Sequence, residues 1–258
     1  MHHSYVDRFS QGDSPVHRLD ARVKLAAVIA YTIVLISFNQ YVVAALAPLT
    51  IAPLAMLWFG RVPVWFALRR VLLLCPFIAM LCLLSPLYDR GLQHVAFGPW
   101  RLDVTGGWLT ATSIAVKFTL GLLALTVLTC TTPFPLLLEA MRKLRLPKLL
   151  VMQLGFLYRY IFVLIDQALR IRRGRDFRGA ARAPTRRRLS AVGGMIGSLF
   201  VRTIERSERI YVAMCARGYS GEPHSLSQLR CRPIDGLFLA ATGVYLVACR
   251  WLGPAVFF

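Results

Sequence analysis

Acidic residues are scarce in this sequence of 258 residues: 12 Asp and Glu stand against 31 Lys and Arg, so the net charge is +19. Charged residues of both signs make up 17% of the chain, whereas about 25% is usual in a soluble domain. Hydrophobic residues make up 57%, and several apolar runs approach the roughly 20 residues that cross a bilayer. The composition therefore excludes an ordinary soluble protein and predicts a polytopic membrane protein.

Common catalytic and ligand-binding motifs are also missing. The sequence has no phosphate-binding Gly-Lys-Ser/Thr loop, no His-Glu-x-x-His and no Gly-x-Ser-x-Gly. Its six cysteines form no Cys-x-x-Cys pair, and most lie in apolar runs, as buried thiols do. We therefore expect that this chain is not an enzyme, does not bind ATP itself, and has no catalytic residue, metal site or cofactor.

Five apolar runs predict an all-α membrane fold with about five transmembrane helices. They are Val23–Phe38, Tyr41–Phe59, Val71–Tyr88, Trp108–Cys130 and Gly236–Leu252. Basic residues gather in the N-terminal arm, in a predicted loop at 61–70 and in the segment 131–235, while the other loops are nearly neutral. Because Lys and Arg collect on the cytoplasmic side, this pattern places the N-terminus inside and the C-terminus outside.

The expected organisation has three parts. Residues 1–130 form an N-terminal arm and a four-helix membrane bundle, 131–235 form a cytoplasmic segment, and 236–258 form the final transmembrane helix. Of the 31 Lys and Arg, 20 lie between Glu139 and Asp235 with seven acids, so this range carries a net charge of +13. The basicity is therefore local and marks the cytoplasmic face.

The cytoplasmic segment predicts amphipathic helices. Pro133 and Pro135 begin a short one, Pro147 begins another, and Leu189–Cys215 forms a long one after a basic linker at Gly174–Arg188. The run Leu149–Ile165 is apolar enough to span the membrane. However, Arg159, Asp166, Arg170 and Arg173 recur on one face, which favours a helix lying along the membrane or under the bundle.

Lys117 lies inside the predicted fourth span, where a charge is costly. Such a lysine faces the bundle interior, pairs with an acid or extends its ammonium group toward the interface. The sequence is compatible with both a structural role and a transport role for Lys117. We predict a structural one, because no second ionisable group shares that span.

Two tripeptides of the cytoplasmic segment carry the most specific signal, Phe177-Arg178-Gly179 and Ala216-Arg217-Gly218. Each follows a predicted helix, and a glycine there can take the left-handed conformation that ends helices. The preceding arginine then lies in the last turn, and its planar fork suits a groove lined by carboxylates. One such tripeptide is usually only a helix end; two in one basic segment point to docking.

Four stretches carry a resemblance to a known family. They are Tyr5–Arg8, Ser14–Lys24, Tyr158–Tyr160 and Ala213–Tyr219. They resemble the energising transmembrane (T) subunit of energy-coupling factor (ECF) transporters, and most closely the cobalt-transport subfamily CbiQ. The resemblance covers nearly the whole chain.

The resemblance implies a multi-pass subunit of the bacterial inner membrane in an ATP-driven importer for cobalt or nickel. Two CbiO-like ATP-binding-cassette subunits would receive the two tripeptides, that is Phe177, Arg178 and Gly179, then Ala216, Arg217 and Gly218. Phe177 stands where the family commonly has Ala, so Arg175 is an alternative to Arg178. The movement would pass to a CbiM-like substrate-binding membrane subunit, with a small CbiN-like subunit as a further partner.

Other classes of function compete with this interpretation. A stand-alone metal or cation permease has Lys117 and the N-terminal histidines in its favour. A basic membrane-anchored module would bind anionic lipid or nucleic acid, and an integral membrane enzyme lacks a catalytic constellation. The resemblance favours the coupling subunit, with membrane lipid and no nucleic acid as a partner.

Overall fold

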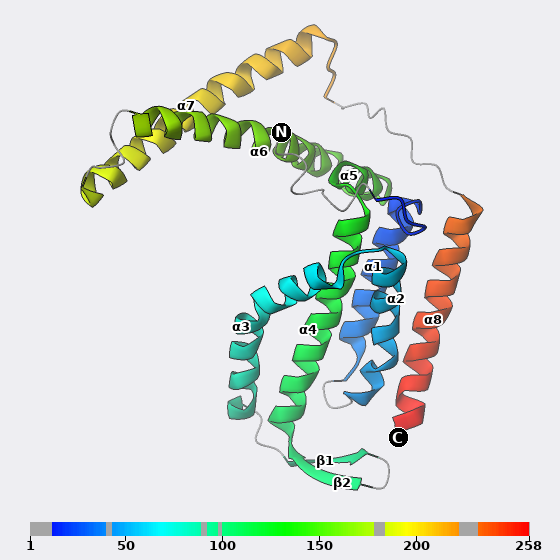
Figure 1. Ribbon diagram of the computed structural model, residues 1–258. Coiled ribbons are helices and arrows are strands. Elements are labelled where there is room, and N and C mark those ends of the chain that lie inside the picture. The colour runs from blue at the N-terminus through cyan, green and yellow to red at the C-terminus, as the bar shows by residue number, and fades with distance from the viewer. Residues whose placement is uncertain are drawn as a thin grey trace. The chain divides into compact units, whose positions relative to one another are not determined.

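A computed structural model of the chain describes residues 12–39, 43–88, 92–97, 100–177, 184–221 and 232–257. Figure 1 shows these residues almost wholly as helices, with one small hairpin. They group into two compact units: Met141–Gln228 belongs to one, and Tyr5–Ala140 with Leu229–Phe258 belongs to the other. The predicted all-α membrane fold is confirmed. The boundaries at residues 130 and 235 between the three parts expected from the sequence stay predictions.

The larger unit is a bundle of helices. Its elements are α1 (Ala21–Ser37), the 3₁₀ turns η2 (Ala44–Leu46) and η3 (Pro48–Thr50), α2 (Ile51–Phe59), α3 (Val64–Tyr88), the strands β1 (Leu92–Phe97) and β2 (Trp100–Thr105), α4 (Gly106–Thr131), most of α5 (Phe134–Lys143), and α8 (Pro233–Phe257). α4 packs against α1, α2 and α3, and α8 packs against α1 and both 3₁₀ turns. Tyr31, Leu35, Leu46, Leu49 and Leu246 belong to its main buried cluster.

Four of the described helices are long and apolar enough to cross a membrane: Val64–Ser85, Gly106–Thr131, Lys148–Phe177 and Pro233–Trp251. Three coincide with predicted spans. The predicted second span, Tyr41–Phe59, for which Pro48 and Pro53 predict kinks, is not one continuous helix over its described residues 43–59. Two 3₁₀ turns precede α2, which has nine residues. Pro48 and Pro53 explain the break, since proline lacks the N–H that a continuous helix needs.

The predicted basic loop at 61–70 is also wrong for most of its length. α3 begins at Val64, directly after Pro63, and it includes Arg69 and Arg70. Arginine is a good helix former, and no breaker follows Pro63 before the apolar run. The Arg70 guanidinium also lies 4.8 Å from the centroid of the Phe66 ring and donates a 3.0 Å hydrogen bond to Thr129 Oγ1. These contacts tie the first turns of α3 together and to α4.

The segment between the predicted third and fourth spans contains an antiparallel hairpin of β1 and β2, whose register pairs Leu92 with Thr105 and Phe97 with Trp100. The sequence carried a signal for it, because apolar and polar residues alternate over 100–105. Gly98-Pro99 between the two runs is a turn dipeptide.

The predicted helices of the cytoplasmic segment are confirmed as α5, α6 (Lys148–Phe177) and α7 (Thr185–Ala216). The linker predicted at Gly174–Arg188 is too long, because α6 continues through Gly174 to Phe177 and α7 starts at Thr185. Pro184 is the N-cap of α7, a place that suits its fixed φ. α6 has the length and composition of a span; whether it crosses the membrane or lies along it stays a prediction.

Lys117 meets the end of α1. Its Nζ donates a 2.6 Å hydrogen bond to the carbonyl oxygen of Phe38, the C-cap residue of that helix. The Arg250 guanidinium lies 5.4 Å from the centroid of the Phe38 ring. Cations are favourable beside the carbonyl end of a helix, so this arrangement supports the structural role predicted for Lys117.

Lys117→Met is accordingly expected to leave transport within a few-fold of the wild type, provided that the complex assembles. The substitution removes one hydrogen bond from a charged donor to a helix end, which contributes about 1.5–3 kcal/mol. ATP-driven metal uptake and the yield of assembled complex should be measured together, with Lys117→Arg as the charge-preserving control. Complete loss of uptake in a normally assembled, ATP-hydrolysing Lys117→Met complex would contradict the structural role.

A buried polar cluster, formed by Asp20, Lys24, Thr131 and Asp235, lies at the other end of α1. All four are at most 6% exposed. Asp20 caps α1 by accepting a 2.8 Å hydrogen bond from the Arg22 N–H. Its own N–H donates to Asp235 Oδ1 at 3.0 Å, and Lys24 Nζ donates to the Thr131 carbonyl at 3.0 Å. The cluster thus joins the starts of α1 and α8 to the end of α4.

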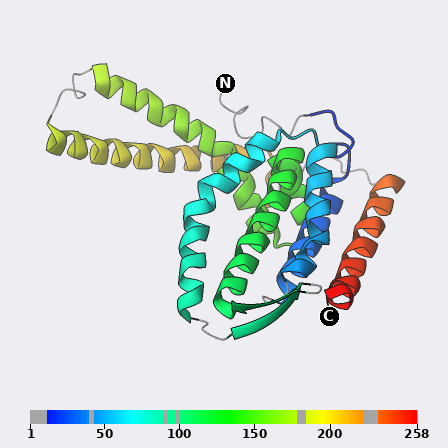
Figure 2. The same cartoon turned by 60° about the horizontal axis from the view of Figure 1, so that its bottom comes forward.

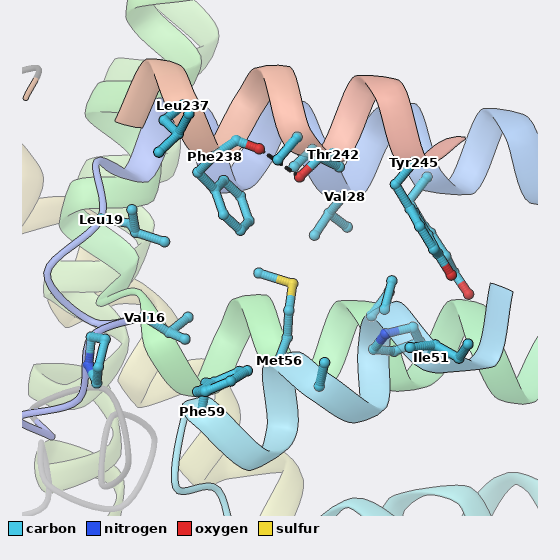
Figure 3. Close-up of a pocket in the computed structure, with 18 of the residues that line it drawn as sticks. Val16, Leu19, Val28, Ile51, Met56, Phe59, Leu237, Phe238, Thr242 and Tyr245 are labelled. Carbon is cyan, nitrogen blue, oxygen red and sulfur yellow. Dashed lines mark hydrogen bonds between the residues drawn. The ribbon is translucent and has the colours of Figure 1, made fainter. Parts of the chain in front are cut away.

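An apolar cavity of about 600 Å³ lies between the N-terminal arm, α1, α2 and α8. Figure 3 shows Val28, Met56 and Phe238 among the side chains around it. The hydroxyl of Thr242 donates to the Phe238 carbonyl at 2.8 Å, and the hydroxyl of Tyr245 donates to the Pro48 carbonyl. The described residues that line the cavity include no carboxylate, amine or imidazole, so this lining suits an apolar group rather than a metal ion.

Candidate coupling site

The smaller unit is built on α6 and α7, which pack against each other. Met152, near the start of α6, lies against Tyr219, just beyond the end of α7. Gln167, farther along α6, lies beside Arg202 and Arg206 in the first two-thirds of α7. The two helices therefore run in opposite directions, as Figure 2 also shows.

The contacts between these helices are mainly apolar. Phe156, Tyr160 and Leu164 of α6 face Ile210 and Met214 of α7 across a groove of about 390 Å³. At one end of this groove the Tyr219 hydroxyl donates to Met152 Sδ at 2.9 Å. The end of α7 is thereby held against the start of α6.

The antiparallel arrangement separates the two predicted docking tripeptides. The end of α7 lies beside Met152, near the start of α6, because Tyr219 contacts that residue. The other end of α6 is Phe177. At 1.5 Å per residue, the stretch of α6 between these points is about 38 Å long. Phe177, the first residue of one tripeptide, and Ala216–Gly218, the other tripeptide, therefore lie at opposite ends of the helix pair.

The end of α7 has the cap that its sequence predicts. Gly218 has φ +81°, which confirms the left-handed glycine. Its N–H donates to the Cys215 carbonyl at 3.0 Å, and the Tyr219 N–H donates to the Met214 carbonyl at 3.1 Å. These two bonds are the Schellman pattern of helix termination. Arg217 is the C-cap residue, so its exposed side chain stands at the very end of the helix.

Gly218→Ala is expected to weaken this helix end by about 1–2 kcal/mol, because a side chain is strained in the left-handed region. Gly218→Asn should cost less, since Asn tolerates that conformation. Hydrogen exchange at the amides of Gly218 and Tyr219 measures the effect. Gly197→Ala, inside α7 with open space around it, is the matched control. It should leave that exchange unchanged or slower, because Ala favours a helix over Gly.

The other tripeptide is only partly within the described residues. Phe177 ends α6 and is 90% exposed, while Arg178 and Gly179 lie outside the described residues. Arg175, the alternative to Arg178, lies in the last turn of α6, where its Nη2 is 3.0 Å from Asp176 Oδ1. That ion pair makes Arg175 less available to a partner than an unpaired arginine.

A third arginine–glycine pair, Arg173-Gly174, is not among the docking residues predicted from the sequence. It lies one turn before the end of α6, and nothing lies within 4 Å of a side chain added at Gly174. The signal that could have identified it is the dipeptide itself, which recurs three times between 173 and 218. Arg173 is exposed and is therefore a further candidate at this end of the pair.

The electrostatic setting of Arg217 differs from that of Arg175. Among the described residues, Arg217 has no carboxylate within ion-pair distance. Residues 216–218 are all exposed. The site therefore presents an uncompensated guanidinium beyond a rigid helix end, which is suited to a carboxylate on another protein. Within the described residues there is no group of three or more His, Cys, Asp or Glu that could hold a metal.

Comparison with known proteins identifies the family. The profile of CbiQ, described as cobalt transport protein, matches residues 12–227. This chain belongs to the CbiQ family. It is the transmembrane T subunit of an energy-coupling factor transporter, related to CbiQ, and a multi-pass protein of the cell membrane.

Two curated relatives are similar in sequence to this chain over most of its length. The energy-coupling factor transporter transmembrane protein EcfT of Limosilactobacillus fermentum is 30% identical over 258 residues, covering 91% of this chain and 92% of that protein. EcfT of Lactococcus lactis subsp. cremoris is 28% identical over 232 residues, 86% of each. A protein named as the fused cobalt transport protein CbiMQ, of Methanocorpusculum labreanum, is 32% identical over 125 residues, 48% of this chain and 21% of that one.

Proposed function

We propose that this T subunit couples two ATP-binding-cassette ATPase subunits to a separate substrate-binding membrane subunit, and that the imported ion is cobalt or nickel. The observation that supports the proposal is the antiparallel packing of α6 and α7, which puts the C-terminal ends of the two helices at opposite ends of the pair. The chain itself is non-catalytic and needs no cofactor. ATP hydrolysis belongs to the ATPase subunits.

The mechanism follows from the rigidity of the helix pair. Arg217 at one end, and Arg178 or its neighbours at the other, each bind the carboxylates of a groove on one ATPase subunit. A helix transmits displacement along its axis because each turn is tied to the next by backbone hydrogen bonds. When ATP binding closes the two ATPase subunits, both ends of the pair move, and the exposed apolar side chains of α6 and α7 pass the movement to the substrate-binding subunit.

The substrate is inferred from names of the family and of one relative. The family is described as cobalt transport protein, and the fused relative joins CbiM and CbiQ in its name. A CbiM-like substrate-binding subunit, with a CbiN-like small subunit, is accordingly the proposed membrane partner, and CbiO-like proteins are the proposed ATPases. Selectivity between cobalt and nickel would belong to the substrate-binding subunit.

Co-expression tests the proposal. This chain should be purified with its CbiO-like and CbiM-like partners, reconstituted in liposomes and assayed for ATP-driven uptake of radioactive cobalt and nickel. We expect ATPase subunits in a stoichiometric complex, and no uptake when this chain is omitted. Uptake by this chain without ATPase subunits would instead show a stand-alone permease.

The orientation of the smaller unit is a separate prediction. Thr185→Cys and Ser225→Cys, each as the single cysteine of the protein, are expected to react with an impermeant thiol reagent only from the cytoplasmic side. The reason is the basic charge of the surrounding segment. Gln93→Cys, in the predicted outer hairpin, is the control and should react only from the outside. Outside labelling at position 185 or 225 would contradict the predicted topology.

A further inference from the structure

Three arginines of α7 and one glutamine of α6 line a polar cavity in the smaller unit. The cavity has a volume of about 570 Å³, and its lining consists of Gln167, Arg202, Arg206, Arg209, Ile210 and Ala213. We call it the arginine pocket. None of the described residues that line it belongs to a docking tripeptide, so the proposal below does not depend on the proposed coupling function.

Helical spacing brings the three guanidinium groups together. Arg206 follows Arg202 by four residues and Arg209 follows Arg206 by three, and side chains at these spacings share one face of a helix. Gln167 faces them from α6, which packs against α7. The pocket is therefore formed by tertiary packing and not by a run of arginines along one exposed helix.

The charge of the pocket is not balanced within the described residues. No carboxylate there lies within ion-pair distance of Arg202, Arg206 or Arg209, and no acid lines the cavity. Arg209 Nε donates only to the backbone carbonyl of Glu205, at 3.2 Å. Like charges at these spacings repel each other. An anion bound between the three guanidinium groups would attract each of them and offset their mutual repulsion.

Gln167 provides a second observation at the same place. Its Oε1 atom is buried and has no hydrogen-bond partner among the described residues. A buried amide without a partner is unfavourable. A half-turn of the amide would direct its NH₂ group to the same place. The NH₂ group donates hydrogen bonds, and an anion in the pocket would accept one.

We propose that the arginine pocket binds a phosphate group, carried either by the headgroup of an anionic lipid or by free phosphate. Guanidinium groups match phosphate oxygens in geometry and donate two parallel hydrogen bonds each. Basic pockets of membrane proteins bind anionic headgroups in this way. Large apolar side chains of α7, among them Phe200, Val201 and Ile204, are exposed and could contact the acyl chains of such a lipid.

The test uses the purified full chain with Arg202, Arg206 and Arg209 all changed to Gln. Inorganic phosphate is titrated in one arm, and the shift of the thermal unfolding midpoint is followed. In the other arm the protein is placed in phosphatidylcholine nanodiscs with and without phosphatidylglycerol, and retained lipid is counted by native mass spectrometry. The control changes Arg170, Arg172 and Arg186 to Gln, which removes the same charge from positions of the same two helices that do not line the pocket.

We expect binding in at least one arm to weaken by about tenfold or more in the pocket variant and by less than about twofold in the control. Saturable binding of inorganic phosphate would assign the site to a free phosphate, whereas an effect of phosphatidylglycerol alone would assign it to a lipid headgroup. Lysine at all three positions should retain only part of the affinity, because charge stays and the planar fork is lost.

Two results would overturn the proposal. One is an equal loss in the pocket variant and the control, which would show unspecific charge attraction. The other is a pocket variant that binds phosphate and phosphatidylglycerol like the wild type and loses only co-purified ATPase subunits. The pocket would then be a protein contact.

Discussion

Alanine at Arg217 is expected to reduce the amount of ATPase subunit that co-purifies with this chain, and to uncouple ATP hydrolysis from metal uptake. Arg217 stands exposed at the C-cap of α7 and has no ion pair among the described residues. In the proposed complex its guanidinium would be desolvated against acidic groups of the partner. Removing one partner of such a contact costs about 2–5 kcal/mol.

Alanine at Arg178 should have an effect of the same kind at the other end of the helix pair, and the double variant should be worse than either single one. Glutamate at either position should be more severe than alanine, because it places like charges in one groove. The measurements are the co-purified ATPase per T subunit and the ATP-driven uptake of all variants.

Arg186→Ala is the control for this series. Arg186 is exposed in the first turn of α7, and a solvated surface charge contributes about 0–1 kcal/mol. If the Arg178 and Arg217 variants retain as much ATPase as this control, the coupling assignment is wrong.

Arg173→Ala and Arg175→Ala identify the arginine that acts at the end of α6. Arg175 is paired with Asp176, whereas Arg173 is exposed beside a glycine with open space around it. Loss of ATPase in the Arg173 variant, with the Arg178 variant unaffected, would move the docking residue one turn back along the helix.

Local signals in this sequence were sufficient where the structure depends on neighbours in the chain. Gly218 was predicted as a left-handed cap and has φ +81°, because the conformation of a helix end depends on a few adjacent residues. Pro133 and Pro147 predicted the starts of α5 and α6 for the same reason. The basic stretch 61–70 predicts a loop and so a start of α3 several residues too late, because arginine is a good helix former and α3 begins at Val64.

Features that depend on distant residues could not be predicted. Nothing in the sequence indicates that Asp20 and Asp235 meet, because 215 residues separate them. The arginine pocket has the same origin: Arg202, Arg206 and Arg209 form an ordinary polar helix face until Gln167 of α6 closes it. The partner of Lys117 is a backbone carbonyl, and the sequence of a segment does not show which carbonyl groups remain free at a helix end.

Asp235→Ala is expected to have the largest effect on stability of any single substitution considered for this chain. The carboxylate of Asp235 accepts hydrogen bonds from the backbone N–H of Asp20 at 3.0 Å and of Arg232 at 2.7 Å. It also interacts with the charge of Lys24. Alanine would leave two backbone N–H groups and a buried ammonium group without this partner. Each hydrogen bond to a charged acceptor contributes about 1.5–3 kcal/mol, so the loss of both costs on the order of 3–5 kcal/mol.

For a chain of this size, that loss corresponds to a decrease of roughly 6–20 °C in the unfolding midpoint. Thermal unfolding of the detergent-purified protein measures it. Asp235→Asn should lower the midpoint less, since its carbonyl oxygen keeps one of the two acceptor positions. Glu208→Ala, at an exposed position of α7, is the control and should change the midpoint little.

The combination of Asp235→Ala with Lys24→Met separates a charge effect from a simple loss of packing. Each single variant removes the interaction between Lys24 and Asp235, and the double variant removes it only once, with Asp20 present throughout. Its destabilisation should therefore be smaller than the sum of the two single effects. Strict additivity would show that Lys24 and Asp235 do not interact. An Asp235→Ala midpoint equal to that of Glu208→Ala would show that the cluster does not hold α8 to α1.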